Sequence, residues 1–323
     1  MKHWLLPLVL LVEIAIFTAI SGNSFHSGAE LIAYFQSYFA DLFCQSAPVL
    51  LVAFGMTLVL MTGGIDLSVG SMVALIACVM ASFPAGLEFW WTAVPLGLAL
   101  GLLLGGANGA LMAWLDVPPI IATLGTMIFY RGLCFVVMGD LEKSPFLGVP
   151  GYEHFGQIVG AGILVALIFG GGGWWFTRSR WRRQILMLGG NRVAARYTGI
   201  PVGLRTVQAY GLMGLLAFLA ALSFTARNSS VSASSLTGLE LQVIVAVVLG
   251  GTRVQGGAGT LAGTFFGVLI IAVMDEGLRG ASKWGGEHLP FKISHLEYIL
   301  LGSLLIAGVW LNTPRAARAK KIR

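Results

Sequence analysis

The residues of this sequence that could take part in chemistry are single polar groups set in long apolar stretches. Glu13, Asn108 and Arg131 lie within such stretches, and Asp66 and Glu240 lie at their edges. A charged or amide side chain is costly at membrane depth, where it usually marks a solute pathway or a hydrogen-bonded partner. For Arg131 we expect either a structural role or a role in the pathway or its gate. For Glu13 we expect contact with a neighbouring helix.

The sequence lacks the residue patterns that the common enzymes need. No HExxH, GxSxG or CxxC pattern occurs, which argues against the usual zinc, serine and dithiol chemistry. No phosphate-binding loop occurs either, so any ATP would have to bind to another subunit. The three cysteines are interpreted as small buried hydrophobic residues, and the five histidines lie in loops or at termini, so no proton relay is apparent. We expect no catalytic residue, no metal site and no cofactor.

The composition indicates that most of the chain is surrounded by lipid. Hydrophobic residues make up 57% of the 323 positions and charged residues only 11%, whereas soluble domains carry about 25% charged residues. The apolar stretches recur along the whole chain. The net charge of +6 is therefore interpreted through the placement of Lys and Arg in loops, and we expect no nucleic-acid partner.

We predict an all-α polytopic membrane protein with one transmembrane domain, residues 1–323. A bilayer core of about 30 Å needs about 20 apolar residues per helix. Ten stretches are candidate spans: Trp4–Ile20, Phe43–Met61, Val69–Ala85, Trp91–Leu115, Ile120–Met138, Gly160–Phe176, Val207–Phe224, Gly238–Gly251, Gly259–Met274 and Leu296–Leu311. The eighth is short enough to be broken or re-entrant, so eight to ten full crossings fit the sequence. The first resembles a signal peptide, but its apolar run is long, which favours a retained helix.

The basic residues predict which loops face the cytoplasm. Cytoplasmic loops of membrane proteins collect Lys and Arg. With ten spans, 14 of the 20 basic residues fall on one side: Lys2, Arg178, Arg180, Arg182, Arg183, Arg192, Arg196, Arg205, Arg253, Arg315, Arg318, Lys320, Lys321 and Arg323. We therefore predict that both termini, the loop 177–206 and the basic tail 312–323 are cytoplasmic.

Two glycine repeats and two glycine-rich turns indicate closely packed helices. Glycine recurs every four residues at Gly97, Gly101, Gly105 and Gly109, and again at Gly259, Gly263 and Gly267. Such stripes let helix backbones approach one another closely. The turns 63–70 and 250–259 could be tight connections that use the backbone freedom of glycine, or they could shape the inner mouth of a pathway.

A short helix is predicted within the basic loop. Asn191 can cap it, residues 192–198 can form two turns, and Gly199 can close it before Pro201. Val193 and Tyr197 then share one face, and Arg192 and Arg196 share another. A helix this short is not stable alone in water. It must dock against the protein's own rim or a partner's groove, unless the segment is only a solvated turn that carries charge.

Several motifs make the chain resemble the permease subunits of bacterial ABC importers for monosaccharides, the group that includes ribose permease. The branched-chain amino acid permeases are similar but more distant. The resemblance covers nearly the whole chain after the first span. The motifs are Gly55–Thr57, Gly63–Ser71, Pro119–Thr126, Arg131–Gly132, Gly189–Asn191, Ala194–Ala195, Gly199–Ile200, Gly238–Leu241, Val247–Thr252 and Gly256–Gly257.

The resemblance implies partners and a mechanism. The permease would work as a homodimeric or heterodimeric pair, with two cytoplasmic ABC ATPase subunits and a periplasmic sugar-binding protein, by alternating access. Contact with the ATPase is expected at Gly189, Gly190, Asn191, Arg192, Ala194, Ala195, Arg196, Gly199 and Ile200. A translocation pathway or gate is expected at Asp66, Ser68, Asn108, Thr123, Thr126, Arg131 and Glu240.

Three departures from the family pattern limit these expectations. Gln242-Val243 replaces the Asp-Ala pair that the family usually has, and the segment Asp275–Arg279 is unlike the family, as is the loop 139–157. The sugar stays open among ribose, other pentoses, deoxyhexoses and furanosyl signal molecules. A motor-free secondary transporter and a membrane enzyme are the competing classes, but the first lacks an intramembrane ion site and the second lacks catalytic groups.

Overall fold

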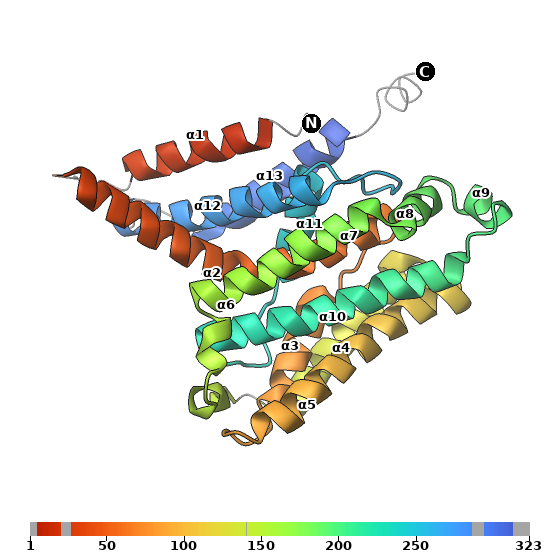
Figure 1. Cartoon of the computed structure of the whole chain (residues 1–323), viewed down its shortest axis with the longest axis horizontal. Helices are drawn as coiled ribbons and strands as arrows, with labels where there is room; N and C mark the ends of the chain where they lie inside the picture. Colours follow the sequence, from red (N-terminus) through yellow and green to blue (C-terminus); the bar gives the residue numbers. More distant parts are fainter. Residues whose placement is uncertain (1–4, 21–26, 140, 286–293, 313–323) are drawn as a thin grey trace.

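The fold is a bundle of helices (Figure 1). The computed structural model describes residues 5–20, 27–139, 141–285 and 294–312. Within these ranges the regular elements are helices, joined by one isolated bridge between Lys143 and Val231. An all-helical fold rich in apolar helices confirms the predicted class of polytopic membrane protein. The basic tail from residue 313 onward, Lys2 and Lys292 lie outside the described residues.

The helices follow one another along the chain with short connections. They are α1 (Leu5–Ile20), α2 (Gly28–Met61), α3 (Val69–Met80), α4 (Phe89–Trp114), α5 (Pro119–Met138), the short 3-10 helices η1 (Pro145–Gly148) and η2 (Tyr152–Phe155), α6 (Ile158–Val165), the π-helical segment η3 (Ala166–Gly172), α7 (Gly173–Arg178), α8 (Arg180–Gly190), α9 (Arg192–Tyr197), α10 (Val202–Asn228), α11 (Leu239–Leu249), α12 (Leu261–Gly285) and α13 (Ser294–Asn312).

Six of the described helical segments are long and apolar enough to cross a membrane. They are 32–61, 89–114, 119–138, 158–178, 202–228 and 261–279. In contrast, α3 has 12 residues and α11 has 11, which gives lengths of about 18 and 16 Å at 1.5 Å per residue. Neither reaches across a core of about 30 Å. The ten predicted spans all fall on helices, but the number of full crossings and the orientation stay predictions.

The start of α2 differs from the predicted span. The helix begins at Gly28, well before the predicted start at Phe43. The hydroxyl of Ser27 caps it by accepting the N–H of Glu30 at 3.2 Å, and a serine in this position satisfies a backbone donor that the helix cannot. The hydrophobic pattern located the apolar core of the helix but not this more polar first half.

Two further boundaries also correct the prediction. The third span was expected to reach Ala85, but α3 ends at Met80 because Pro84 follows closely and the residue before a proline disfavours the helical conformation. The ninth was expected to start at Gly259, but α12 starts at Leu261. Gly259 therefore lies in the turn before α12, whereas Gly263 and Gly267 lie within the helix.

The glycine stripe of α4 lies against α10, and these two helices form the most extensive contact of the bundle. A Cβ atom added at Gly101 would lie 2.5 Å from the carbonyl oxygen of Gly214, and one at Gly109 would lie 2.7 Å from Cα of Val207. At Gly105 it would overlap the carbonyl of Tyr210. The backbones are thus in direct contact, which only glycine permits.

A second close approach joins α11 to α12. Cβ atoms added at Gly263 and Gly267 would overlap the carbonyl oxygens of Gly250 and Ala246. A Cβ added at Gly259 would lie 2.8 Å from the hydroxyl of Thr252. The same packing principle therefore holds the short helix α11 in the second half of the bundle.

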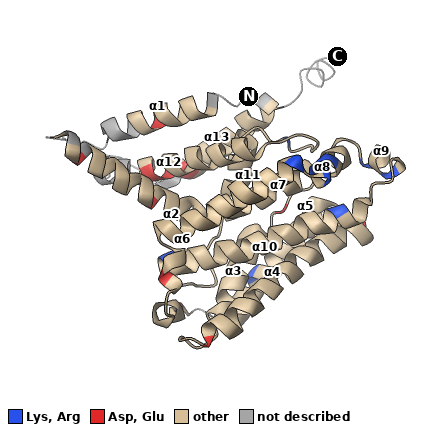
Figure 2. Cartoon of the chain, viewed as in Figure 1, with Lys and Arg blue, Asp and Glu red and all other residues tan. Residues whose placement is uncertain are grey.

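Charge separates the two ends of the bundle. Lys and Arg gather at the end formed by α8 and α9, while most Asp and Glu lie towards the opposite end (Figure 2). The first residues of α1 and the last residues of α13 lie towards the same side of the view as α8 (Figure 1). This arrangement is the one that a cytoplasmic face bearing α8, α9 and both termini would have.

We expect Gly101→Leu to destabilise the protein by about 1–3 kcal/mol or more, the usual cost of overpacking a filled core. The leucine would have to displace α10, because Gly101 touches the backbone of Gly214. The measurement is the thermal unfolding temperature of the purified protein in detergent. Gly106→Leu is the matched control, since it lies on the same helix and has open space around it. Equal unfolding temperatures for the two variants would contradict the packing role of the stripe.

Candidate functional site

A hydrogen-bonded polar network lies inside the bundle at the turn between α2 and α3. Asp66 Oδ1 accepts the backbone N–H of Ser68 at 2.9 Å and its hydroxyl at 2.6 Å. Asn108 of α4 donates its Nδ2 to the same hydroxyl oxygen at 2.8 Å. All three side chains are fully buried. The network therefore fixes the first turn of α3 against α4.

Three more side chains complete this network. The hydroxyl of Tyr130 donates towards Leu104 O at 3.0 Å and Asn108 Oδ1 at 3.2 Å. The carbonyl of Ile65 accepts from Thr123 Oγ1 at 3.1 Å and from the Tyr210 hydroxyl at 3.3 Å. The structure thus brings together four predicted pathway residues, Asp66, Ser68, Asn108 and Thr123. It adds Tyr130 and Tyr210, which sequence reasoning missed because each stands in an ordinary apolar helix.

The network leaves one acceptor unused. Asp66 Oδ2 is buried and has no hydrogen-bond partner among the described residues. The burial of these four predicted residues indicates that they hold the turn in this conformation. Their role in a pathway or gate remains a prediction.

The other three predicted pathway residues lie outside this network, Thr126 and Arg131 on α5 and Glu240 on α11. Arg131 Nη1 donates to the carbonyls of Ala233 and Ser235 at 2.6 and 2.8 Å. Thr126 donates to Thr123 O at 3.3 Å. Glu240 is half-buried in the first turn of α11, where the helix dipole favours an acidic group. Arg131 thus holds the loop that leads into α11 in place. These two hydrogen bonds account for a cation at this position without a bound solute.

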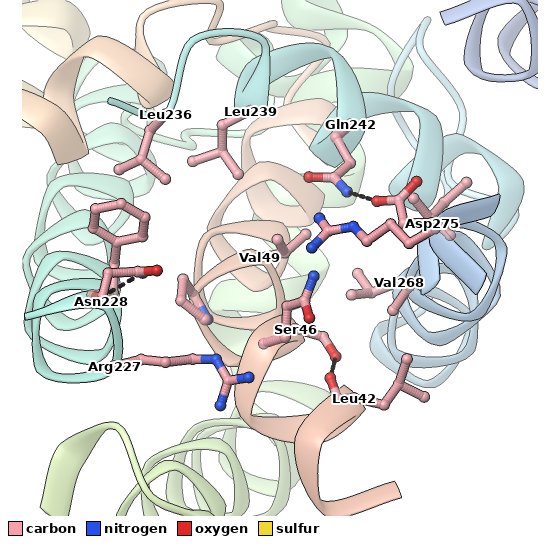
Figure 3. Close-up of a pocket in the computed structure, with 16 residues that line it drawn as sticks. Leu42, Ser46, Val49, Arg227, Asn228, Leu236, Leu239, Gln242, Val268 and Asp275 are labelled. Carbon is pink, nitrogen blue, oxygen red and sulfur yellow. Dashed lines mark hydrogen bonds between the residues drawn. The ribbon is translucent and has the colours of Figure 1, made fainter. Parts of the chain in front are cut away.

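A separate cavity of about 360 Å³ opens between α2, α10, α11 and α12. Gln242 Nε2 donates to Asp275 Oδ2 at 2.6 Å across part of its wall. Figure 3 shows Arg227 and Asn228 on the opposite side, with Ser46 and Val49 of α2 between the two walls. Sequence analysis did not predict a site here. It did single out Gln242 and the segment Asp275–Arg279 as departures from the family, and these two departures meet in this cavity.

The predicted short helix in the basic loop is confirmed as α9. Asn191 Oδ1 accepts the N–H of Ala194 at 3.0 Å, and the chain leaves the helix through Gly199 at a φ of +79°, which favours glycine. Val193 is 65% exposed and Tyr197 is 89% exposed. The expected face of α9 is therefore free in this chain, and a six-residue helix that exposes a tyrosine and a valine is suited to docking.

The end of α8, which leads directly into α9, touches the rest of the protein through main-chain atoms. The N–H of Gly257 donates to Met61 O at 3.0 Å. A Cβ atom at Gly189 would overlap that same carbonyl, and one at Gly257 would lie 2.9 Å from Cα of Gly190. The ends of α8 and α2 and the turn before α12 thus meet at one point. Because α9 follows Gly190 directly, a displacement of α9 would be transmitted through these main-chain contacts to the end of α2 and to the turn that leads to Asp66.

These features are those of a polytopic membrane protein, and comparison with known proteins identifies its family as one of permeases. Residues 38–309 match the family described as "Branched-chain amino acid transport system / permease component". The chain belongs to this family, and within it the chain is similar to the ribose-permease group of ABC permeases. No solved structure is significantly similar to it.

Curated relatives cover most of the chain. It is 37% identical to the ribose import permease protein RbsC of Escherichia coli (strain K12), over 86% of this chain and 87% of the relative. It is 36% identical to the autoinducer 2 import system permease protein LsrC of Klebsiella pneumoniae, over 86% and 82%. It is 29% identical to the D-allose transport system permease protein AlsC of Escherichia coli (strain K12), over 94% and 89%. The resemblance inferred from the motifs is thus confirmed.

We expect Tyr130→Phe to lower the free energy of unfolding by about 1–3 kcal/mol, the cost of leaving a buried acceptor unsatisfied. The change removes only the hydroxyl that donates towards Leu104 and Asn108. Tyr298→Phe is the matched control, because that side chain is 69% exposed. The measurement compares the thermal unfolding temperatures of the two variants in detergent. Equal temperatures would show that these hydrogen bonds do not contribute to stability.

Proposed function

We propose that this chain is the membrane-spanning subunit of an ATP-driven importer that moves a monosaccharide or a related furanosyl compound into the cytoplasm. The family supports the permease role, and the names of the relatives, which concern ribose, D-allose and autoinducer 2, support the class of solute. The inner membrane of a bacterium is then its location. The whole chain would act as one transmembrane unit, with the loop 177–206 and the basic tail at its cytoplasmic face.

The partners follow from the same reasoning. Two ABC ATPase subunits would bind and hydrolyse ATP, a second permease subunit would complete the pathway, and a periplasmic binding protein would deliver the sugar. ATP-driven closure would bias the permease pair between inward-open and outward-open states. Such coupling needs a physical element that both sites influence.

The observation that carries the proposal is the exposed helix α9 at the basic end of the bundle. Its cap and its glycine exit fix its shape, while Val193 and Tyr197 project with no partner within the described chain. An amphipathic helix of this kind fits a groove on a partner. The main-chain contacts of Gly189, at the end of α8, and of Gly257 with the end of α2 would carry the motion of the ATPase from α9 into the bundle.

The first test is to isolate the tagged protein from its native membrane in mild detergent and identify its companions by mass spectrometry. We expect a stoichiometric ATPase subunit and a binding protein. The purified complex, reconstituted in liposomes, should then import D-ribose or D-allose when ATP is inside and the binding protein outside. A preparation that contains no ATPase even after cross-linking would refute the proposal and favour a secondary transporter.

We expect Ala194→Asp to reduce sugar import by about tenfold or more, since an unpaired charge in an interface is strongly unfavourable. Ala194 is exposed and its N–H is already capped by Asn191, and an acidic residue in the first turn suits the helix dipole. The permease should therefore fold and insert normally, and ATP hydrolysis should no longer respond to the sugar-loaded binding protein. Ala194→Ser is the control.

Gly199→Val should have a similar effect by a different route. A β-branched residue is strained at a φ of +79°. The substitution would therefore displace the end of α9, whereas Ala194→Asp adds a charge to it. Normal import by both Ala194→Asp and Gly199→Val would remove α9 from the coupling mechanism.

A further inference from the structure

The cavity between α2, α10, α11 and α12 combines polar and apolar walls within a single chain. Its volume of about 360 Å³ falls at the lower end of the range of about 300–1,000 Å³ for small-molecule sites. Leu236, Leu239 and Val268 form apolar parts of the wall (Figure 3). The polar parts come from all four helices: Gln45, Ser46, Arg227, Asn228, Gln242, Asp275 and Arg279.

The two arginines at this cavity are held by partners within the chain. Arg227 Nη2 lies 3.6 Å from Asp41 Oδ1, and Arg279 lines the same wall region as Asp275. With its amide oxygen turned towards Arg279, Gln45 accepts from both terminal guanidinium nitrogens at 3.0 Å. Both guanidinium groups are thus engaged by the chain itself, while Asp275 also interacts electrostatically with the carboxyl groups of Glu13, Glu276 and Glu297.

Asp275 retains unused hydrogen-bonding capacity at this site. The residue is only 8% exposed, and while Oδ2 accepts from Gln242, Oδ1 has no hydrogen-bond partner in the described part of the chain. A carboxylate held inside a bundle is costly unless its remaining acceptor is filled. The hydroxyl groups of a sugar are suitable donors, and a carboxylate beside an amide can bind two neighbouring hydroxyls.

We infer that this cavity binds the sugar during import, with Asp275 and Gln242 as the residues that recognise its hydroxyl groups. The inference rests on the proposed function and adds a site to it. The apolar wall would contact the carbon face of the sugar ring, while the amides, the hydroxyl of Ser46 and the guanidinium groups hold its edges. The cavity lies towards the end of the bundle opposite α8 and α9, which is the side from which a sugar would enter.

The test uses the complete transporter in liposomes with D-ribose and D-allose as the two sugars. Asp275→Asn preserves the shape of the side chain and its acceptor for Gln242 but removes the charge. Gln242→Met removes the amide at constant length. Asp116→Asn is the matched control, because it makes the same change at an exposed aspartate outside the cavity lining.

We expect Asp275→Asn and Gln242→Met to raise the KM for the imported sugar about tenfold, the scale expected for a lost bond to a charged group. They should also change the ratio of D-ribose to D-allose import, which does not depend on the amount of folded protein. Asp116→Asn should change neither quantity. If the wild type imports sugar and all three variants match it, the inference fails while the proposed function stands. If the wild type imports none of the sugars that the co-purified binding protein binds, the proposed function fails, and the inference that rests on it fails too.

A second measurement tests occupancy of the cavity directly. Ala272 lines it, so Ala272→Cys should react with a small cationic methanethiosulfonate reagent added from the outside. The transported sugar should slow this reaction. The wild-type chain, whose cysteines are buried, gives the background. A cysteine that reacts at the same rate with and without sugar, or does not react because lipid fills the space, would overturn the inference.

Discussion

The need to satisfy interrupted backbone inside the bundle is the constraint on which the rest of this structure depends. Lipid cannot hydrogen-bond the N–H and C=O groups that become free where a helix stops. Between α2 and α3 the carbonyl of Ile65 is satisfied by Thr123 and Tyr210, and Asp66 accepts from Ser68. Before α11 the carbonyls of Ala233 and Ser235 are satisfied by Arg131. The polar groups inside the bundle are thus explained first by two short helices that begin within it.

Glycine provides the second condition for such a fold. α4 meets α10 backbone to backbone at Gly101 and Gly105, and Asn108 of the same helix reaches Ser68 at the start of α3. A similar glycine contact at Gly189 and Gly257 joins the end of α8, which precedes α9, to the end of α2. The close contacts that allow polar side chains to meet in the interior therefore also link that interior to the basic end of the protein.

The sequence predicted the features that depend on local pattern. Apolar length located the helices, the four-residue glycine spacing indicated a packing face, and Asn191 and Gly199 marked both ends of α9. It could not predict which residues meet across long separations. Tyr130 and Tyr210 look like ordinary members of apolar helices. The bond between Gln242 and Asp275 joins positions 33 residues apart, and nothing in either segment alone specifies the other.

The cavity at Asp275 is built from four helices of one chain, and this has a consequence for stoichiometry. Under the proposed function, two copies of the chain in one transporter would carry two copies of the cavity, related by twofold symmetry. A binding protein that releases one solute molecule at a time would then fill one copy before the other. The symmetric pair would become asymmetric at each delivery, and the number of solute molecules carried per cycle of ATP hydrolysis would depend on whether both copies are filled before the pair turns inward.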